Sequence, residues 1–197
     1  MKKTIAFIFF CALWALSASA QNTVESIRKV YQEVHEMMAQ MTPDKEGMSA
    51  MPPEYFDLQV VQNLPATGGH KENIRMYYGE LEPEEEGDPY PPHYLRFTTA
   101  KYNFAAREFY EEYLYDDKGQ VMFIYAYTPN EDLTKILEFR LYFDGQRLLQ
   151  LNVKADETDV YKGTTIPEEY SGYCSLYTDR ARHNLDLFKA IDSHTHL

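Results

Sequence analysis

The feature that most constrains the fold is a series of five strand-like segments with no room for a helix between them. Each is rich in tyrosine, phenylalanine and aliphatic residues, and they cover 94–103, 107–115, 120–128, 135–143 and 147–153. Strands with such short connections pair in antiparallel fashion, because a parallel crossover needs a dozen or more residues. This part of the chain therefore predicts an antiparallel meander.

The segments on either side of the predicted meander show apolar patterns of their own. Apolar residues at spacings of three and four predict an amphipathic helix through Val24, Ile27, Tyr31, Val34, Met38 and Met41. Asn22 is expected to cap this helix, with Glu25 at the capping-box distance. Further strands are predicted at 55–62 and 74–81, and a last helix at about 175–192. We expect one α+β domain over 21–197, with an N-terminal helix, an antiparallel meander sheet of about six or seven strands and a C-terminal helix.

The first twenty residues are typical of a secretory signal peptide. Lys2 and Lys3 precede the apolar run 5–16, and Ala18 and Ala20 form a small-residue cleavage site. Cleavage is expected between Ala20 and Gln21, which predicts a periplasmic or secreted protein. No later segment reaches the roughly 18 apolar residues of a membrane span, so the mature chain is not expected to cross a membrane.

The net charge argues against one class of binding partner, and the cysteine content argues against an internal disulfide. The chain has a formal net charge of −12, and the predicted signal peptide holds two lysines and no acid. So acidic a chain repels phosphate backbones, and no nucleic-acid partner is expected. Cys11 belongs to the signal peptide, which leaves Cys174 without a partner for an internal disulfide.

The chain carries no recognisable catalytic motif. It has no G-x-S-x-G, no H-E-x-x-H and no phosphate-binding glycine loop. Glu111 and Glu112 are adjacent on a predicted strand, so they point to opposite faces and cannot act as a pair. We therefore expect no enzyme activity, no cofactor and no metal.

Tyrosines in the first predicted hairpin suggest a binding surface. If Asp116 pairs with Gln120, then Tyr113 lies opposite Phe123. One sheet face then holds five candidate ligand-binding residues: Tyr113, Tyr115, Tyr125, Tyr127 and Glu111. Two amphipathic helices can cover one sheet face well but not two, so one face is expected to be partly uncovered. Exposed tyrosines beside carboxylates suit sugar stacking or peptide docking, whereas the same face covered by a helix would be core.

The second predicted hairpin admits two registers. A two-residue turn at Asp144-Gly145 sets Glu138 opposite Leu151. A three-residue loop over 144–146 instead pairs Phe139 with Leu151 and Leu141 with Leu149, and it turns Glu138 and Arg140 away. A one-residue slip reverses every side chain, so we expect the hydrophobic pattern to decide in favour of the second register.

The two hairpin sequences, EEYLYDDKGQVMFIYAY and LEFRLYFDGQRLLQLNV, resemble hairpins of uncharacterised exported bacterial proteins. The resemblance implies an antiparallel sheet and no particular activity, cofactor or site residue. The leading functional hypothesis is a non-catalytic exported module that binds a protein or glycan through a tyrosine-rich sheet face. The alternative is a small carboxylate-based hydrolase of envelope or extracellular glycans, which would need two carboxylates roughly 5–9.5 Å apart in a cleft.

Overall fold

The computed structural model describes residues 21–83 and 91–195, and the predicted signal peptide lies outside these ranges. Within them, one helix precedes an eight-stranded antiparallel sheet and a second helix follows it. The elements are α1 (Val24–Met41), β1 (Tyr55–Leu64), β2 (Gly68–Glu80), β3 (His93–Phe104), β4 (Arg107–Tyr115), β5 (Val121–Pro129), β6 (Ile136–Asp144), β7 (Arg147–Ala155), β8 (Thr158–Gly163) and α2 (Glu168–Thr195). Their order confirms the predicted α+β class.

The strands lie in the sheet in chain order, β1 to β8, so the meander is continuous. The described residues contain one strand more than the upper limit expected. The additional strand is β8, whose sequence TDVYKG lies mostly exposed at the edge of the sheet and has little apolar pattern. The last helix also begins earlier than expected, at Glu168 directly after Pro167. Proline and acidic residues are both favoured in the first turn of a helix.

Helix α1 begins at a different cap from the one predicted. Thr23 is the N-cap, and its side chain and that of Ser26 bond each other's backbone N–H groups. The apolar stripe is as predicted, because Ile27, Val34 and Met41 are buried against the sheet. The backbone N–H of Asn22 instead donates to Asp144 Oδ1 at 3.2 Å, which joins the start of the helix to the end of β6.

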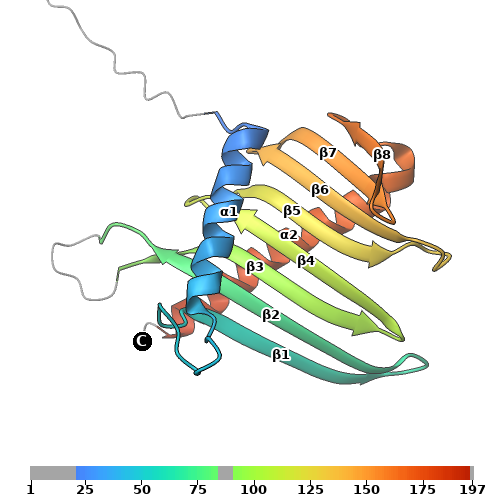
Figure 1. The fold of residues 1–197 in the computed structure, drawn as a ribbon. Coiled ribbons are helices and arrows are strands. Elements are labelled where there is room, and N and C mark those ends of the chain that lie inside the picture. Colours follow the sequence, from blue (N-terminus) through green and yellow to red (C-terminus); the bar gives the residue numbers. More distant parts are fainter. Residues whose placement is uncertain (1–20, 84–90, 196–197) are drawn as a thin grey trace, which may run out of the picture.

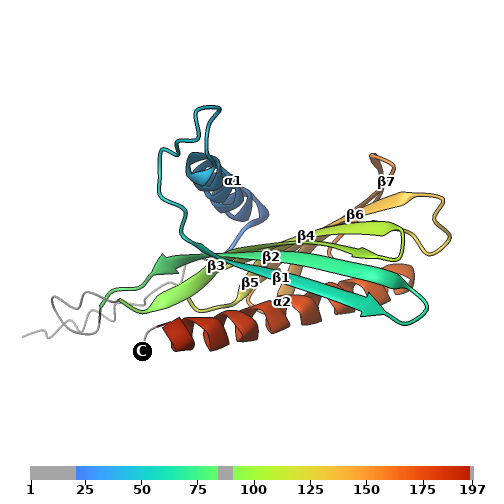
Figure 2. The ribbon, with the colours of Figure 1, turned by 90° about the horizontal axis from the view of Figure 1, so that it is seen from below.

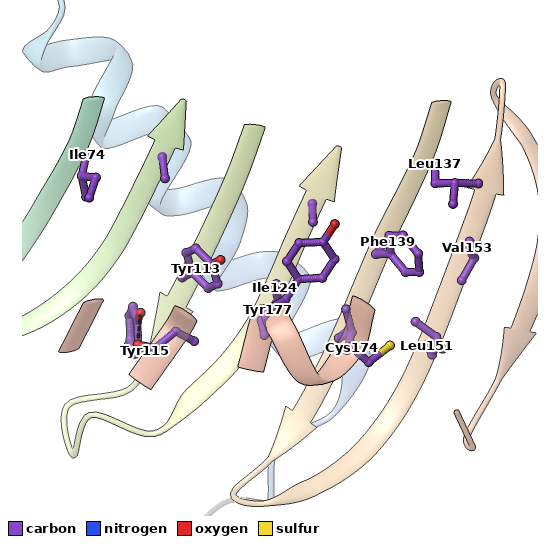
Figure 3. Packing of buried hydrophobic residues seen from close by; sticks show 14 of the residues in the cluster. Ile74, Tyr113, Tyr115, Ile124, Leu137, Phe139, Leu151, Val153, Cys174 and Tyr177 are labelled. Atoms are coloured by element: carbon purple, nitrogen blue, oxygen red, sulfur yellow. Dashed lines mark hydrogen bonds between the residues drawn. The ribbon is translucent and has the colours of Figure 1, made fainter. Parts of the chain in front are cut away.

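The two helices cover opposite faces of the sheet, and each has its own apolar core (Figures 1 and 2). On the α2 side, the residues drawn in Figure 3 pack around Tyr113, Ile124, Phe139 and Tyr177. On the α1 side, Ile27 and Val34 belong to a cluster with Phe97, Leu114, Phe123 and Tyr142.

The two helices differ greatly in length. At about 1.5 Å per residue, the 28 residues of α2 can follow the sheet much further than the 18 residues of α1. Figure 1 looks onto the α1 side, where the helix crosses the strands near one end and leaves the rest of the face open. The expectation of one partly covered face agrees with this arrangement.

A β-bulge overturns the predicted register of the first hairpin. The turn is as expected, because Asp116 N–H donates to the carbonyl of Gln120 at 2.9 Å. Tyr115 then pairs with Val121 but Leu114 pairs with Phe123, so Met122 is an extra residue in β5. Beyond the bulge Tyr113 lies opposite Ile124 rather than Phe123. One extra residue reverses the facing of every later side chain relative to the partner strand.

The second hairpin turns at Gly145-Gln146 and then carries a second bulge, so neither register considered for it holds. Asp144 pairs with Arg147, Leu149 is the extra residue, and Leu141 then pairs with Leu151. The facing expected from the hydrophobic pattern holds for Phe139, Leu141 and Leu151, which belong to the α2-side core, but is wrong for Leu149, which was expected to share their face. Glu138 and Arg140 face the α1 side, and Leu149 packs there too.

Neither helix in the described residues has an apolar stretch long enough to cross a membrane.

Candidate functional site

The five residues expected to form one cluster lie on two different faces. Tyr113 and Tyr115 (Figure 3) and Glu111, which contacts Arg180, point toward α2 and are 0, 2 and 1% exposed. Tyr125 and Tyr127 lie on the α1 side, where Tyr125 is half-buried and Tyr127 is 37% exposed. The expectation of a single cluster is therefore wrong, and its physical cause is the bulge at Met122 described above.

Glu111 holds α2 against the sheet. Its carboxylate accepts hydrogen bonds from Tyr102 Oη at 2.7 Å and Tyr113 Oη at 2.5 Å, and from Arg180 Nε of α2 at 2.7 Å. Arg180 Nη2 also donates to Glu72 on β2 at 2.8 Å. Tyr115 makes a similar link through its hydroxyl, which donates to the carbonyl of Ala181 at 2.8 Å. These three predicted site residues thus join helix to sheet instead of facing solvent.

The uncovered part of the α1 side is a polar surface built from two rows of cross-strand neighbours. The strand pairings place one residue from each of β1 to β8 in the first row, and one from each of β1 to β7 in the second, all on the same face. The first row is Asp57, Arg75, Thr99, Glu112, Tyr125, Arg140, Asn152 and Lys162. The second row is Gln59, Asn73, Lys101, Tyr110, Tyr127, Glu138 and Lys154. We call these two rows the open face.

The open face begins at the edge of the sheet area that α1 covers. The neighbouring row on the same side holds Tyr77, Phe97, Leu114, Phe123 and Tyr142, all buried under the helix. In the two open rows every side chain but that of Glu112 is half-buried or exposed. The change from apolar to polar rows therefore follows the edge of α1.

Three tyrosines form an aromatic patch in the middle of the open face. Tyr110 pairs directly with Tyr127 across β4 and β5, and the rings of Tyr110 and Tyr125 lie 6.3 Å apart between centroids. Tyr110 was not among the predicted site residues, because the bulge-free register assigns it to the other face from Tyr125. We call Tyr110, Tyr125 and Tyr127 the tyrosine patch.

Glu112 is a buried anion beneath the edge of α1. It is 3% exposed and accepts hydrogen bonds from Tyr31 Oη of the helix and from Tyr110 Oη at 2.7 Å. His35 Nε2 lies 3.6 Å from its Oε2. Burial alone would raise the pKa of Glu112, but the interactions with His35, Tyr31 and Tyr110 outweigh it and hold the pKa below its usual value. The carboxylate is therefore ionised and engaged by its own partners.

Two hollows of opposite charge border the tyrosine patch. The first, of about 390 Å³, lies between α1 and the sheet and is lined by Arg28, Tyr31, Phe123, Tyr125, Arg140 and Tyr142. The second, of about 290 Å³, lies toward the β7–β8 turn and is lined by Tyr127, Ile136, Glu138, Asp156 and Glu157. We call them the arginine hollow and the acidic hollow. Arg28 and Arg140 were not predicted as site residues, since they are 112 positions apart in the chain.

The ion pair of Arg140 and Glu138 on the open face contacts the tyrosine patch. Arg140 Nη2 donates to Glu138 Oε2 at 3.0 Å, and its guanidinium carbon lies 5.2 Å from the centroid of the Tyr125 ring. Tyr125 Oη is 3.4 Å from the same Glu138 oxygen. Burial and the negative charge of Glu138 raise the pKa of Tyr125 to about 12, so its hydroxyl keeps its proton and can donate at neutral pH.

The α2 side has two larger hollows, of about 430 and 480 Å³, which are seams between the helix and the strand ends. In the part of the chain that the structure describes, no three histidine, cysteine, aspartate or glutamate side chains converge as metal ligands would. Glu111 and Glu112 point to opposite faces, as their adjacency on β4 predicts. The hollow of about 430 Å³ also combines rings with polar groups, whereas the open face carries such groups across the whole width of the sheet.

Comparison of the chain with protein-family models, with curated proteins and with solved structures finds no match. The arguments about function therefore rest on the geometry of the open face.

Proposed function

We propose that this protein is an exported, non-catalytic binding module whose ligand is a glycan laid across the open face. The observation that carries the proposal is the tyrosine patch, which lies on a polar sheet face next to the rows that α1 covers. Tyrosine presents a flat apolar ring and a hydroxyl, and it loses little side-chain entropy on contact. Such rings suit the apolar faces of sugars, while the surrounding polar groups suit their hydroxyls.

The two rows offer hydrogen-bonding groups on both sides of the patch. Thr99 and Asn73 lie toward β1, and Asn152 lies toward β8, where Gln150 Nε2 donates to its Oδ1 at 2.9 Å. Neighbouring strands are about 4.8 Å apart, so the side chains of one row repeat at a spacing comparable with the length of one pyranose unit. A glycan chain running across the strands can therefore meet successive side chains of a row.

A glycan fits the open face better than a folded protein partner does. Stable protein interfaces usually have an apolar core from which charged residues are depleted. The two rows instead mix charges of both signs with amides and tyrosines. Export is the part of this proposal that rests on the sequence, through the predicted cleavage after Ala20.

The tyrosine patch can be tested by affinity electrophoresis of the mature chain in gels that contain soluble polysaccharides. Suitable probes are mixed-linkage glucan, xyloglucan, polygalacturonate, alginate and hyaluronate. We expect at least one polymer to retard the protein, and the double variant Tyr125→Ala/Tyr127→Ala to lose at least tenfold in affinity. The paired variant Tyr125→Phe/Tyr127→Phe keeps the rings and should retain most of the binding.

Phe104→Ala is the matched control, because this aromatic side chain is 48% exposed and lies outside the open face. Its affinity should equal that of the unchanged protein. Far-UV circular dichroism of each variant separates lost binding from lost fold. If a glycan array and all five polymers show no binding, the proposal is overturned. If the protein releases reducing ends from any of them, the hydrolase alternative replaces it.

A further inference from the structure

The arginine hollow is a concentration of positive charge in an acidic chain. Arg28 reaches it from α1 and Arg140 from β6, and the chain as a whole has a formal net charge of −12. Two acidic groups contact the residues that line the hollow, and both are engaged. Glu138 pairs with Arg140 at 3.0 Å, and Glu112 is buried and accepts from Tyr31 and Tyr110. Two guanidinium groups thus line the hollow, and one of them is paired with Glu138.

Aromatic rings hold both arginines in place. Arg28 Nε donates to Tyr142 Oη at 3.3 Å, and its guanidinium carbon lies 5.4 Å from the centroid of that ring. Arg140 is held in the same way by the ring of Tyr125 and by Glu138. A guanidinium group has five N–H donors. Among the described residues, the side-chain hydrogen bonds of Arg28 and Arg140 use one N–H of each, so donors remain for a ligand.

We infer that the arginine hollow binds the carboxylate of a uronic acid residue in the glycan, an inference that rests on the proposed function. The planar fork of arginine matches a carboxylate and binds it through two parallel hydrogen bonds. A hollow of about 390 Å³ falls within the usual range for small-ligand sites. Tyr125 belongs both to the wall of the hollow and to the tyrosine patch, so a sugar seated there is continuous with one stacked on the patch.

The charges of the two hollows give the glycan a direction. Glu138, Asp156 and Glu157 line the acidic hollow on the other side of the patch and repel a carboxylate. The acidic sugar is therefore placed at the α1 end of the open face, and a neutral sugar at the β7–β8 end.

The test compares polymers that differ in the carboxylate alone. The mature chain is titrated calorimetrically with polygalacturonate, alginate and hyaluronate, and with each polymer after chemical reduction of its carboxylates to primary alcohols. We expect at least one native polymer to bind tenfold or more tightly than its reduced form. A sulfated galactan that lacks uronic acid serves as the other anionic probe and should bind at least tenfold more weakly than that native polymer.

Two arginine variants test whether the preference for the carboxylate arises in the arginine hollow. Arg28→Gln and Arg140→Gln should each weaken binding of the native polymer at least fivefold and leave binding of the reduced polymer unchanged. Arg28 is exposed on a helix, so its replacement keeps the test valid even if Arg140→Gln disturbs the sheet. Arg182→Gln removes the same charge from α2, where the side chain is 65% exposed, and should leave affinity unchanged.

Failure of this inference is distinguishable from failure of the proposed function. Equal affinity for native and reduced polymers, preference for the sulfated galactan, or equal losses in the Arg28 and Arg182 variants would each overturn the uronate site. In those cases glycan binding by the tyrosine patch would stand. Absence of binding to every polymer would overturn both.

Discussion

At the scale of single residues, two adjacent glutamates on β4 organise the two sides of the sheet. Glu111 accepts from Arg180 of α2, and Glu112 accepts from Tyr31 of α1. Burying a carboxylate is costly unless it is hydrogen-bonded or paired. Sheet tyrosines satisfy each glutamate in part, and the docked helix adds Arg180 to Glu111 or Tyr31 to Glu112, so the pair ties both helices to the middle of the sheet.

Replacement of Glu112 tests this role. We expect Glu112→Gln to lower the free energy of unfolding by about 1–3 kcal/mol at neutral pH, because hydrogen bonds to the ionised form are lost. The folded state lowers the pKa of Glu112 from its usual 4.5. Its contribution is therefore complete above the unfolded-state value and is lost as the pH falls through the lower folded-state pKa. The difference between the two proteins should shrink over that range.

Urea titrations at several pH values between neutral and acid measure this effect. Glu108→Gln is the matched control, since Glu108 lies on the same strand and is exposed. Its midpoint should stay within about 0.5 kcal/mol of the unchanged protein at each pH. A Glu112→Gln protein as stable as the unchanged one at neutral pH would contradict the assigned role.

At the scale of elements, bulges decide which side chains share a face. In the first hairpin the extra residue reverses the expected facing of Tyr125 and Tyr127 relative to Tyr113. In the second hairpin the extra residue restores the facing that the hydrophobic pattern demands. A bulge therefore overturned the facing expected in the first hairpin, whereas in the second hairpin the facing expected for Phe139, Leu141 and Leu151 holds and only Leu149 departs from it.

Deletion of Met122 should show how much the fold depends on its bulge. Without the extra residue, β5 must either strain the turn or present Tyr125 and Tyr127 to the α2 core. We expect a loss of about 3 kcal/mol or more in the free energy of unfolding, measured by urea titration. Met122→Leu keeps both the bulge and the side-chain volume, and should cost less than about 1.5 kcal/mol. If the deletion and Met122→Leu proteins had equal free energies of unfolding, the bulge at Met122 would not set the strand register.

Strand and helix positions were largely predictable, because they follow from local periodicity. The strand over 107–115 has the same bounds in the structure, and the stripe of α1 is buried as expected. The candidate site was predictable only in part. Tyr125 and Tyr127 lie on the open face, but Tyr110 and Arg140 join them through a register that turn residues alone do not reveal. Arg28 joins through helix docking, which no local pattern encodes.

At the scale of the whole molecule, the predicted cleavage site of the signal peptide lies just before the start of α1. Cleavage between Ala20 and Gln21 leaves Thr23 and Ser26 in place to cap α1. Mass spectrometry of the protein from its native cells should therefore show a chain that begins at Gln21. A chain that retains Met1 in a soluble cytoplasmic fraction would contradict export.

The strict order of the strands also bears on how the chain folds. Every strand pairs only with its neighbours in sequence, so each ladder closes a short loop and costs little chain entropy. The sheet can therefore grow by adding one hairpin after another, without a search for distant partners. The helices are the first and last elements of the chain, and their docking requires strands that are already paired. We expect helix docking, rather than strand pairing, to be the late and slower step of folding.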